Sequence, residues 1–317
     1  MEQIKSSTKI AGVDVGKHRL DVAVHGASDL TTVDNTAAGI EVLVDWLRVR
    51  GVGRVGLEAS GGYERAARQA LETAGFAVVV HQPLEVRLFA RLKRLRAKND
   101  RIDAQLIAAA TAQVDAVRAA GDPRFAELAE RMTAYEQAAD LAAQVKHYLE
   151  HVTIADVAEE MTAQLATLKA LKARLAAQLV ARIKAEPDLA ARFRLLLSLP
   201  GIGPIVAAAL VVRMPELGRL RKGQASSLLG VAPFDRDSGQ FKGQRFIAGG
   251  RSRPRRLIYI AALSAKRCDP NLKAFADRLL HAGKPAKLVI TAVMRKLIEA
   301  ANLVIAREQP WVRQLSS

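Results

Sequence analysis

Four acidic residues of this 317-residue chain have the chemical type and the placement to act together: Asp14, Glu58, Asp100 and Asp103. The strand and helix pattern around them predicts that they meet at one point of the fold. Carboxylates do not gather for stability, because like charges a few ångströms apart repel and raise each other's pKa. Divalent cations would neutralise such a cluster, and two cations ~4 Å apart clamp a phosphodiester for cleavage. The four acids are therefore predicted to be metal ligands and catalytic residues.

Each acid also has a plainer structural explanation. Asp100 fits the N-cap of a helix, and Asp103 fits a favourable charge in its first turn. Glu58 fits a loop residue at the end of a short strand. Asp14 resists such an explanation best, because it lies in the middle of a valine-rich strand, where burying an unpaired charge is costly.

The chain is strongly basic, with 48 Lys and Arg residues against 32 Asp and Glu residues and a net charge of +16. This balance predicts a polyanionic partner; the alternative is a basic soluble protein without one. A dense cationic run comes just before the paired aspartates: Arg87, Arg91, Lys93, Arg94, Arg96, Lys98 and Arg101. Such runs are usually solvated faces, but the position beside the proposed metal site favours a path for nucleic-acid phosphates.

A glycine-containing turn, Leu199-Pro200-Gly201-Ile202-Gly203, precedes a helix that is predicted to start at Pro204. It is similar to the turn of helix-hairpin-helix modules. Gly201 and Gly203 are accordingly predicted to let backbone N–H groups meet a nucleic-acid phosphate at the helix N-terminus. A tight turn between helices with no ligand is the alternative.

Ser238 lies in a polar, glycine-containing segment bordered by cations. The candidates for holding a phosphodiester there are Arg236, Lys242, Arg245, Arg251, Arg253, Arg255 and Arg256. Nothing supports a hydrolase triad, since no histidine lies between His151 and His281. Arginines could instead stabilise the charge that develops when a hydroxyl attacks phosphorus. From the residues alone, however, a Ser-Gly pair is more often a turn than a nucleophile.

Composition excludes several kinds of site. A single cysteine, Cys268, rules out an internal disulfide and a cysteine zinc cluster. The six histidines show no metal-ligand spacing, and aromatic residues, at 4%, are too scarce for base stacking to dominate. The polar first residues do not resemble a signal peptide, and no apolar run approaches the ~20 residues of a membrane span. A cytoplasmic, nucleoid-associated protein is expected.

The pattern along the chain predicts an α/β plus α protein. Residues 1–120 are predicted to hold three strands, a helix, a strand, a helix, a strand and a helix, the order of the ribonuclease H fold. Residues 121–192 contain apolar positions that alternate spacings of three and four, which predicts a long helical coiled-coil hairpin with a break near residues 153–156. Residues 193–317 are predicted to form a mostly helical C-terminal domain.

Together these motifs resemble the DEDD transposases of the insertion sequence 110 family, which are bridge-RNA-guided recombinases. The resemblance rests on Gly12 to Lys17, Leu57 to Tyr63, Lys98 to Ala104, Leu199 to Gly203, and Ala232 to Gly239. It implies an RuvC-like domain, a coiled-coil segment and a C-terminal transposase domain with a serine nucleophile, here Ser238.

The resemblance also implies cofactors and partners. The four acids would hold Mg²⁺, a structured noncoding guide RNA would pair with donor and target DNA, and the protein would act as a dimer or tetramer. Serine attack would leave a covalent phosphoserine link to DNA. The alternatives are a metal-only RuvC-like junction nuclease and a non-catalytic RNA- or DNA-binding protein.

Overall fold

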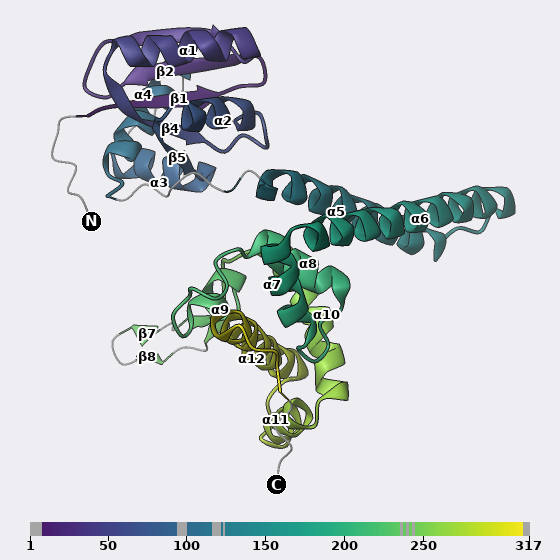
Figure 1. Cartoon of the computed structure of the whole chain (residues 1–317). Helices are drawn as coiled ribbons and strands as arrows, with labels where there is room; N and C mark the ends of the chain where they lie inside the picture. Colours follow the sequence, from purple (N-terminus) through teal and green to yellow (C-terminus); the bar gives the residue numbers. More distant parts are fainter. Residues whose placement is uncertain are drawn as a thin grey trace. The chain divides into compact units, whose positions relative to one another are not determined.

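The computed structural model of the chain describes residues 8–93, 100–115, 122, 124–234, 237–238, 241–242 and 245–312, with the backbone alone for residues 100–102, 237–238 and 241–242. The chain forms two compact units, residues 1–121 and residues 122–317 (Figure 1). The helical segment and the C-terminal domain predicted from the sequence both lie in the second unit.

The first unit is built on a five-stranded sheet. Its strands are β1 (Lys9–Val15), β2 (Arg19–Val24), β3 (Leu30–Asp34), β4 (Val52–Glu58) and β5 (Ala77–His81). Their order is β3-β2-β1-β4-β5, in which β1, β2 and β3 pair antiparallel while β1–β4 and β4–β5 pair parallel. This order is consistent with a ribonuclease H-like domain, and it places the first and fourth strands, β1 and β4, side by side.

Helices cover both faces of the sheet. The helices α1 (Ala37–Val49) and α2 (Arg65–Thr73) share one apolar core with the sheet, in which Val13 of β1, Leu43 of α1 and Leu71 of α2 are fully buried. The helix α4 (Asp100–Ala112) packs against β1, β2 and β4. Successive side chains of a strand point to opposite faces, so one sheet can pack against a layer of helices on each side.

One helix of this unit is not predicted by the sequence pattern. The basic stretch after Pro83 suggests a connection, but Pro83–Leu92 forms α3. Pro83 occupies the first helical turn, where a missing N–H costs nothing, and the Gln82 backbone N–H donates to Glu85 Oε2 at 2.9 Å in a capping box. Val86 packs against Leu106 and Ile107 of α4, while the charged residues stay exposed.

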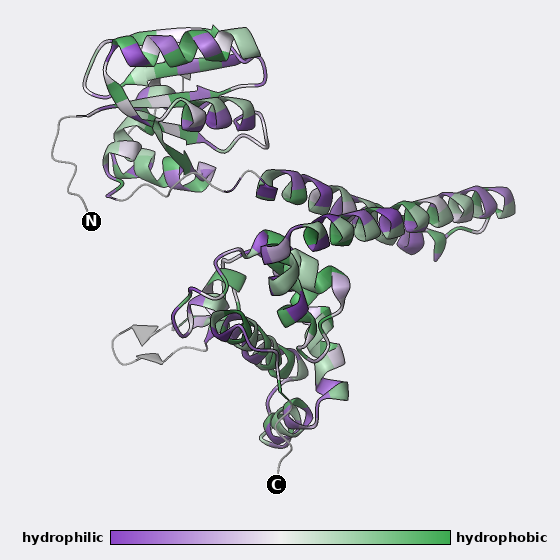
Figure 2. Ribbon diagram, in the orientation of Figure 1, coloured by the Kyte–Doolittle hydropathy of each residue, from purple (hydrophilic) through white to green (hydrophobic). Residues whose placement is uncertain are grey.

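The second unit begins with a long antiparallel hairpin of two helices, α5 (Arg124–Leu149) and α6 (Ala155–Ala185), and the coiled-coil packing expected of this hairpin stays a prediction. Hydrophilic and hydrophobic residues alternate along both helices (Figure 2). Met132 of α5 and Ile183 of α6 are fully buried at its base, whereas Tyr148, near its tip, is exposed. The base of the hairpin therefore belongs to the core of the unit, and the tip does not.

The remaining elements surround a buried helix, α8 (Pro204–Arg213), in which every residue from Val206 to Val212 is buried. The other helices are α7 (Pro187–Leu197), α9 (Gln224–Leu229), α10 (Ser252–Cys268), α11 (Pro270–His281) and α12 (Ala286–Arg307). Within the described ranges, no helix is long and apolar enough to span a bilayer.

Candidate active site

Two glycines bring α4 directly onto the sheet. A Cβ added at Gly12 of β1 would lie 2.2 Å from the Ala104 carbonyl oxygen and 2.3 Å from the Ala108 nitrogen of α4. A Cβ at Gly56 of β4 would lie 1.9 Å from Thr111 Oγ1. Since both glycines face α4, the residues two positions later, Asp14 and Glu58, face the same side of the sheet.

Four polar residues form a row across this face. Asp14 and Asp21 are registered partners on β1 and β2, and Glu58 and His81 are registered partners on β4 and β5. The last registered pair of β1 and β4, Val13 with Leu57, is one position before Asp14 and Glu58. Neighbouring strands lie about 4.8 Å apart, so the row Asp21, Asp14, Glu58, His81 is continuous. We call these four residues the acid row.

The first turn of α4 contains the other two predicted acids. Asp100 is the first residue of α4, and Asp103 immediately precedes Ala104, which covers Gly12. Asp14, Glu58 and Asp103 do not by themselves form a group whose carboxylate oxygens all lie within 4.8 Å, among the side chains that are described. Joint coordination of one ion therefore requires side-chain rotation, the Asp100 carboxylate or both.

Asp21 and His81 are not among the site residues that the sequence predicts. Asp21 accepts a hydrogen bond from Thr32 Oγ1 at 2.5 Å. His81 is buried, and burial lowers its pKa despite the nearby Glu85 carboxylate. The Thr111 hydroxyl donates to the Ile107 carbonyl at 2.7 Å, so it accepts from His81 Nε2 at 2.8 Å. The neutral His81 ring therefore carries its proton on Nε2.

Two side chains hold the loops beside the acid row. Asn35 Nδ2 donates to the carbonyl oxygens of Gly16 (3.0 Å) and Tyr63 (3.1 Å), which joins the turn after β1 to the loop after β4. Glu64 Oε2 accepts from the backbone N–H groups of Ser60 and Gly62. Burial raises the pKa of Glu64, but these hydrogen bonds outweigh it and hold the pKa below its usual range. The loop after Glu58 is thus fixed by a charged side chain.

The predicted cationic run is only partly described. Arg87, Arg91 and Lys93 are exposed on α3. Arg94, Arg96 and Lys98 lie outside the described residues, and Arg101 is described by its backbone alone. Their contact with nucleic acid stays a prediction.

The two glycines of the turn before α8 differ in environment. Gly201 has φ +75°, and a Cβ there would lie 2.3 Å from the Ala261 carbonyl oxygen of α10. Gly201 is therefore needed for the close approach of this turn to α10. Gly203, at the N-cap of α8, has an ordinary φ of −88°, and a Cβ added there would have no atom within 4 Å. Of the two, Gly203 has the space that a phosphate needs.

Ser238 lies on a two-stranded ribbon. The base of the ribbon pairs β6 (Pro233–Phe234) with β9 (Phe246–Ile247), and its outer part pairs β7 (Asp237–Ser238) with β8 (Phe241–Lys242). Ser238 faces Phe241 in this register. The pairing places the serine on a hairpin, where the sequence indicated an open loop.

Arg255 holds the two ends of this ribbon together. Its Nη1 donates to the Gly249 carbonyl, just after β9, at 2.7 Å and to the Gly230 carbonyl, before β6, at 3.2 Å. One guanidinium thus joins the strand that enters the ribbon to the strand that leaves it.

Three other predicted phosphate ligands make contacts within the protein. Arg251 donates to both carboxylate oxygens of Glu216, at 2.6 and 2.8 Å, and this pairing raises the pKa of Arg251. Arg253 and Arg256 both donate to Asp140 of α5. These hydrogen bonds, that from Arg253 first, lower the pKa of Asp140. The Arg253 and Arg256 contacts join α10 to the hairpin, and all three arginines therefore have a structural role.

Three more cations near Ser238 are predicted to contact DNA. Arg245 is exposed, the side chain of Lys242 is not described, and Arg236 lies outside the described residues. Their contact with DNA stays a prediction.

Comparison with known proteins gives two consistent matches. Residues 11–153 match a family model described as Transposase, of the DEDD type found in insertion sequence 110 elements. Residues 193–277 match a family model described as Transposase IS116/IS110/IS902 family. The chain belongs to the insertion sequence 110 family of DEDD transposases. It is therefore a DNA transposase, an enzyme of DNA recombination.

Two relatives of this transposase align with nearly its whole length, and a third aligns with about half of it. It is 24% identical to the pilin gene-inverting proteins of Moraxella bovis and Moraxella lacunata, over 96% of this chain and 98% of each relative. A probable family 20 transposase of Pseudomonas aeruginosa is 29% identical over 48% of this chain and 46% of the relative. The first family match contains all four predicted acids, and the second contains Gly201, Gly203 and Ser238.

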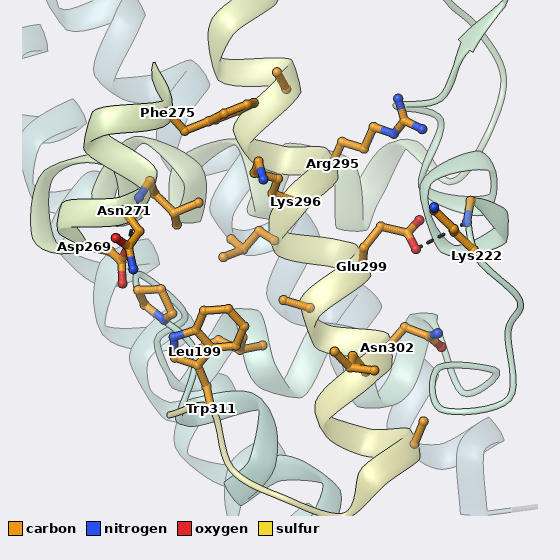
Figure 3. Close-up of a pocket in the computed structure, with 18 of the residues that line it drawn as sticks. Leu199, Lys222, Asp269, Asn271, Phe275, Arg295, Lys296, Glu299, Asn302 and Trp311 are labelled. Atoms are coloured by element: carbon orange, nitrogen blue, oxygen red, sulfur yellow. Dashed lines mark hydrogen bonds between the residues drawn. The ribbon is translucent and has the colours of Figure 1, made fainter. Parts of the chain in front are cut away.

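A cavity of about 1310 Å³ in the second unit of this transposase lies beside the glycine turn (Figure 3). Leu199 and Pro200 of the turn line it together with Lys222, Arg295 and Lys296. Figure 3 shows Arg295, Lys296 and Glu299 along α12. Three cations therefore line the same cavity as the turn that is predicted to contact nucleic acid.

One expectation about metal sites is wrong. The six histidines are expected to show no metal-ligand spacing, but His147 and His151 are four residues apart near the end of α5. Their ring nitrogens and a Glu150 carboxylate oxygen all lie within 4.8 Å of one another. The i, i+3, i+4 spacing is visible in the sequence, and the helix that makes it meaningful is also predicted.

Proposed function

We propose that this transposase is an RNA-guided DNA recombinase that cuts and rejoins DNA through a covalent serine intermediate, with Mg²⁺ held by the four acids. The observation that carries the proposal is the alignment of Asp14 and Glu58 on one sheet face beneath α4, the helix that bears Asp100 and Asp103. The predicted acids lie on three separate elements, β1, β4 and α4, that pack together, and separate structural explanations of the single residues do not require this.

The donor set suits a hard divalent cation. Asp14, Glu58 and Asp103 offer carboxylate oxygens, which Mg²⁺ prefers, and each of the three side chains is partly exposed and so accessible to solvent and ligand. Asp100 would supply the fourth carboxylate. Bound Mg²⁺ would supply positive charge against the scissile phosphate as negative charge develops on it.

Ser238 is the proposed nucleophile. Its Oγ forms a bond to phosphorus, the bond from phosphorus to one deoxyribose oxygen breaks, and the hydroxyl proton leaves Ser238 while the released oxygen gains one. Attack by the newly freed hydroxyl of another strand reverses this exchange and releases the serine. The short β7–β8 pairing and the Arg255 contacts support a defined position for the serine backbone.

The partners proposed are donor DNA, target DNA and a structured guide RNA, bound by a dimer or tetramer. The net charge of +16 and the exposed cations of α3 support a polyanionic partner. The alignment with pilin gene-inverting proteins supports action at defined DNA sites, because inversion of a gene rearranges one segment.

The test combines the protein, the guide RNA, both DNAs and Mg²⁺, followed by denaturation in detergent. We expect a covalent protein–DNA adduct that Ser238→Ala abolishes and that Ser252→Ala, which changes an exposed serine of α10, retains. Normal recombination by Ser238→Ala would refute the nucleophile.

Two alternatives predict different products. A metal-only junction nuclease would give free DNA ends and no adduct. A non-catalytic nucleic-acid-binding protein would show no cleavage, and Asp14→Asn would leave its binding unchanged.

A further inference from the structure

The tip of the α5–α6 hairpin carries a cluster that the transposase chemistry does not use. His147 lies in the last turn of α5, and Glu150 and His151 follow directly after it. The backbone continues to turn there, because Glu150 N–H donates to the His147 carbonyl at 3.2 Å and His151 N–H to the Tyr148 carbonyl at 3.0 Å. This turn places all three side chains on one side of the helix end.

The three side chains are already close to coordination geometry. The His147 and His151 rings have centroids 5.4 Å apart and planes at 86°, and His147 Nδ1 is 3.5 Å from Glu150 Oε2. One ligand atom from each residue lies within 4.8 Å of the others. Ligand atoms around a tetrahedral Zn²⁺ are about 3.3 Å apart, given metal–ligand bonds of about 2.0–2.1 Å. Small rotations of three exposed side chains close that gap.

The local charge favours a cation. Residues 146–160 contain four acidic residues, Glu150, Asp156, Glu159 and Glu160, and one cation, Lys146, although the chain has a net charge of +16. The cluster also lies at the C-terminal end of a 26-residue helix, where the helix dipole attracts positive charge. The tip therefore differs in charge from the rest of the protein.

We propose that His147, Glu150 and His151 bind one divalent transition-metal ion of the Zn²⁺ class. Two imidazole nitrogens and one carboxylate oxygen form a ligand set that favours such ions over Mg²⁺, which prefers oxygen alone. Three protein ligands leave one tetrahedral position open for water or another donor. This site is independent of the acid row and of the recombination mechanism.

The test uses the full-length protein with Zn²⁺ as the probe and a colorimetric chelator as competitor, in excess Mg²⁺ so that all-oxygen sites are occupied. Wild-type protein should bind about one Zn²⁺ per chain with an affinity that His147→Ala or His151→Ala lowers at least about a hundredfold, since losing even an outer partner costs about 10–100-fold. Glu150→Gln should lower the affinity less than loss of either histidine.

Matched controls remove histidines elsewhere. His25→Ala and His281→Ala, both at exposed positions, should bind Zn²⁺ as the wild type does. The three cluster residues are exposed, so far-UV circular dichroism of their variants should match the wild type. Substitution by Co²⁺ should give the visible absorption of a tetrahedral site, lost in the His147→Ala and His151→Ala double variant.

Equal Zn²⁺ affinity of the wild type and the double variant would overturn the proposal. The cluster would then be an exposed pair of His147 and Glu150 with a neighbouring ring. Recombination assays do not enter this test, so failure of the serine mechanism would leave its outcome unchanged.

Discussion

The acid row and the serine ribbon are positioned in different ways. Asp14 and Glu58 lie on the two central strands of a five-stranded sheet, where main-chain hydrogen bonds on both sides and α4 above fix them. Ser238 lies on a strand of two residues, and the ends of its ribbon are joined by the side chain of Arg255. Backbone hydrogen bonds between strands therefore position the acid row, and a few side-chain hydrogen bonds position the serine ribbon.

This difference has a physical consequence. A sheet held by many cooperative hydrogen bonds tolerates the loss of a single surface contact, whereas a two-stranded ribbon alone is marginally stable in water. We expect substitutions at the acid row to change chemistry without changing the fold, and substitutions around the ribbon to change the position of the serine.

The largest effect is expected for Asp14→Asn. The substitution keeps the shape of the side chain but removes the charge that holds a cation, so the rate of strand transfer should fall by about three orders of magnitude, or ~4 kcal/mol. The thermal midpoint should change little, because the amide keeps the shape of a partly exposed side chain and leaves the packing of β1 intact. Strand-transfer assays and calorimetry measure the two effects.

Asp45→Asn is the matched control, because Asp45 is an exposed residue of α1 whose nearest cation, on Arg48, is 3.9 Å away. It should leave both quantities unchanged. An Asp14→Asn protein that recombines at the wild-type rate would remove Asp14 from the site.

The next effect is expected for Gly12→Ala, which tests whether the glycine contact positions α4. The new methyl group would lie 2.2 Å from the Ala104 carbonyl oxygen and 2.3 Å from the Ala108 nitrogen, so α4 must move. Overpacking of this kind costs about 1–3 kcal/mol of unfolding free energy. Recombination should fall as well, because Asp103 moves with the helix. Denaturant unfolding and strand-transfer rates check both expectations.

Gly53→Ala provides the comparison on β4. Its methyl group would lie 2.2 Å from Cγ2 of Thr8 and would meet no atom of α4 within 4 Å. If Gly12→Ala were as stable and as active as Gly53→Ala, the close approach of α4 would not be what positions Asp103.

A smaller effect on stability, but a clear one on activity, is expected for Arg255→Ala. Loss of the contacts to Gly230 and Gly249 should loosen the ribbon and reduce adduct formation by about tenfold, or ~1.4 kcal/mol, a typical worth of charge-assisted hydrogen bonds. The thermal midpoint should change little. Adduct yield in the detergent assay measures this.

Arg255→Lys separates two roles of this cation. A lysine keeps the charge but does not reproduce two directed N–H bonds from a planar group. If Arg255 acts by donating hydrogen bonds to the Gly230 and Gly249 carbonyls, Arg255→Lys should resemble Arg255→Ala. Wild-type activity of the lysine variant would instead indicate a simple phosphate contact.

The smallest effect is expected for Asp140→Asn, which weakens the link between α5 and α10. Arg253 and Arg256 lower the pKa of Asp140 in the folded protein, so this carboxylate contributes stability above its unfolded pKa. That contribution is lost as the pH falls through the lower, folded-state pKa. At pH 7 we expect a loss of about 0.5–1 kcal/mol, since Arg253 and Arg256 are partly exposed and screened by salt.

The measurement is the unfolding free energy of wild type and variant from neutral to acidic pH and in high salt. The difference should shrink in acid and in salt. A difference that is constant across pH would show that packing, and not the ion pair, connects the two helices.

Much of the first unit was predictable because its signals are local. Alternating apolar residues indicate all five strands, and helical spacing with Gly51 and Gly75 indicates α1 and α2. The helix α3 was missed because its basic residues hid a short apolar face, and that face matters only through α4. The sequence therefore identified those strands and helices whose own apolar periodicity is long enough to be recognised without their neighbours.

The candidate site residues show the same difference between local signals and contacts of distant segments. Asp14 stood out from its valine-rich strand, but Asp21 and His81 did not, because strand register alone makes them neighbours of Asp14 and Glu58. Arg251 and Arg253 looked like phosphate ligands because their partners, Glu216 and Asp140, lie 35 and 113 residues away in the chain.

The sequence by itself determined the order of strands and helices, the excess of positive charge and the identity of the acids, because each depends on residue types and short spacings. Only the tertiary structure decided which residues share a face and which arginines are already paired. Those properties depend on strand register and on contacts between distant segments, and short-range patterns in the chain carry neither.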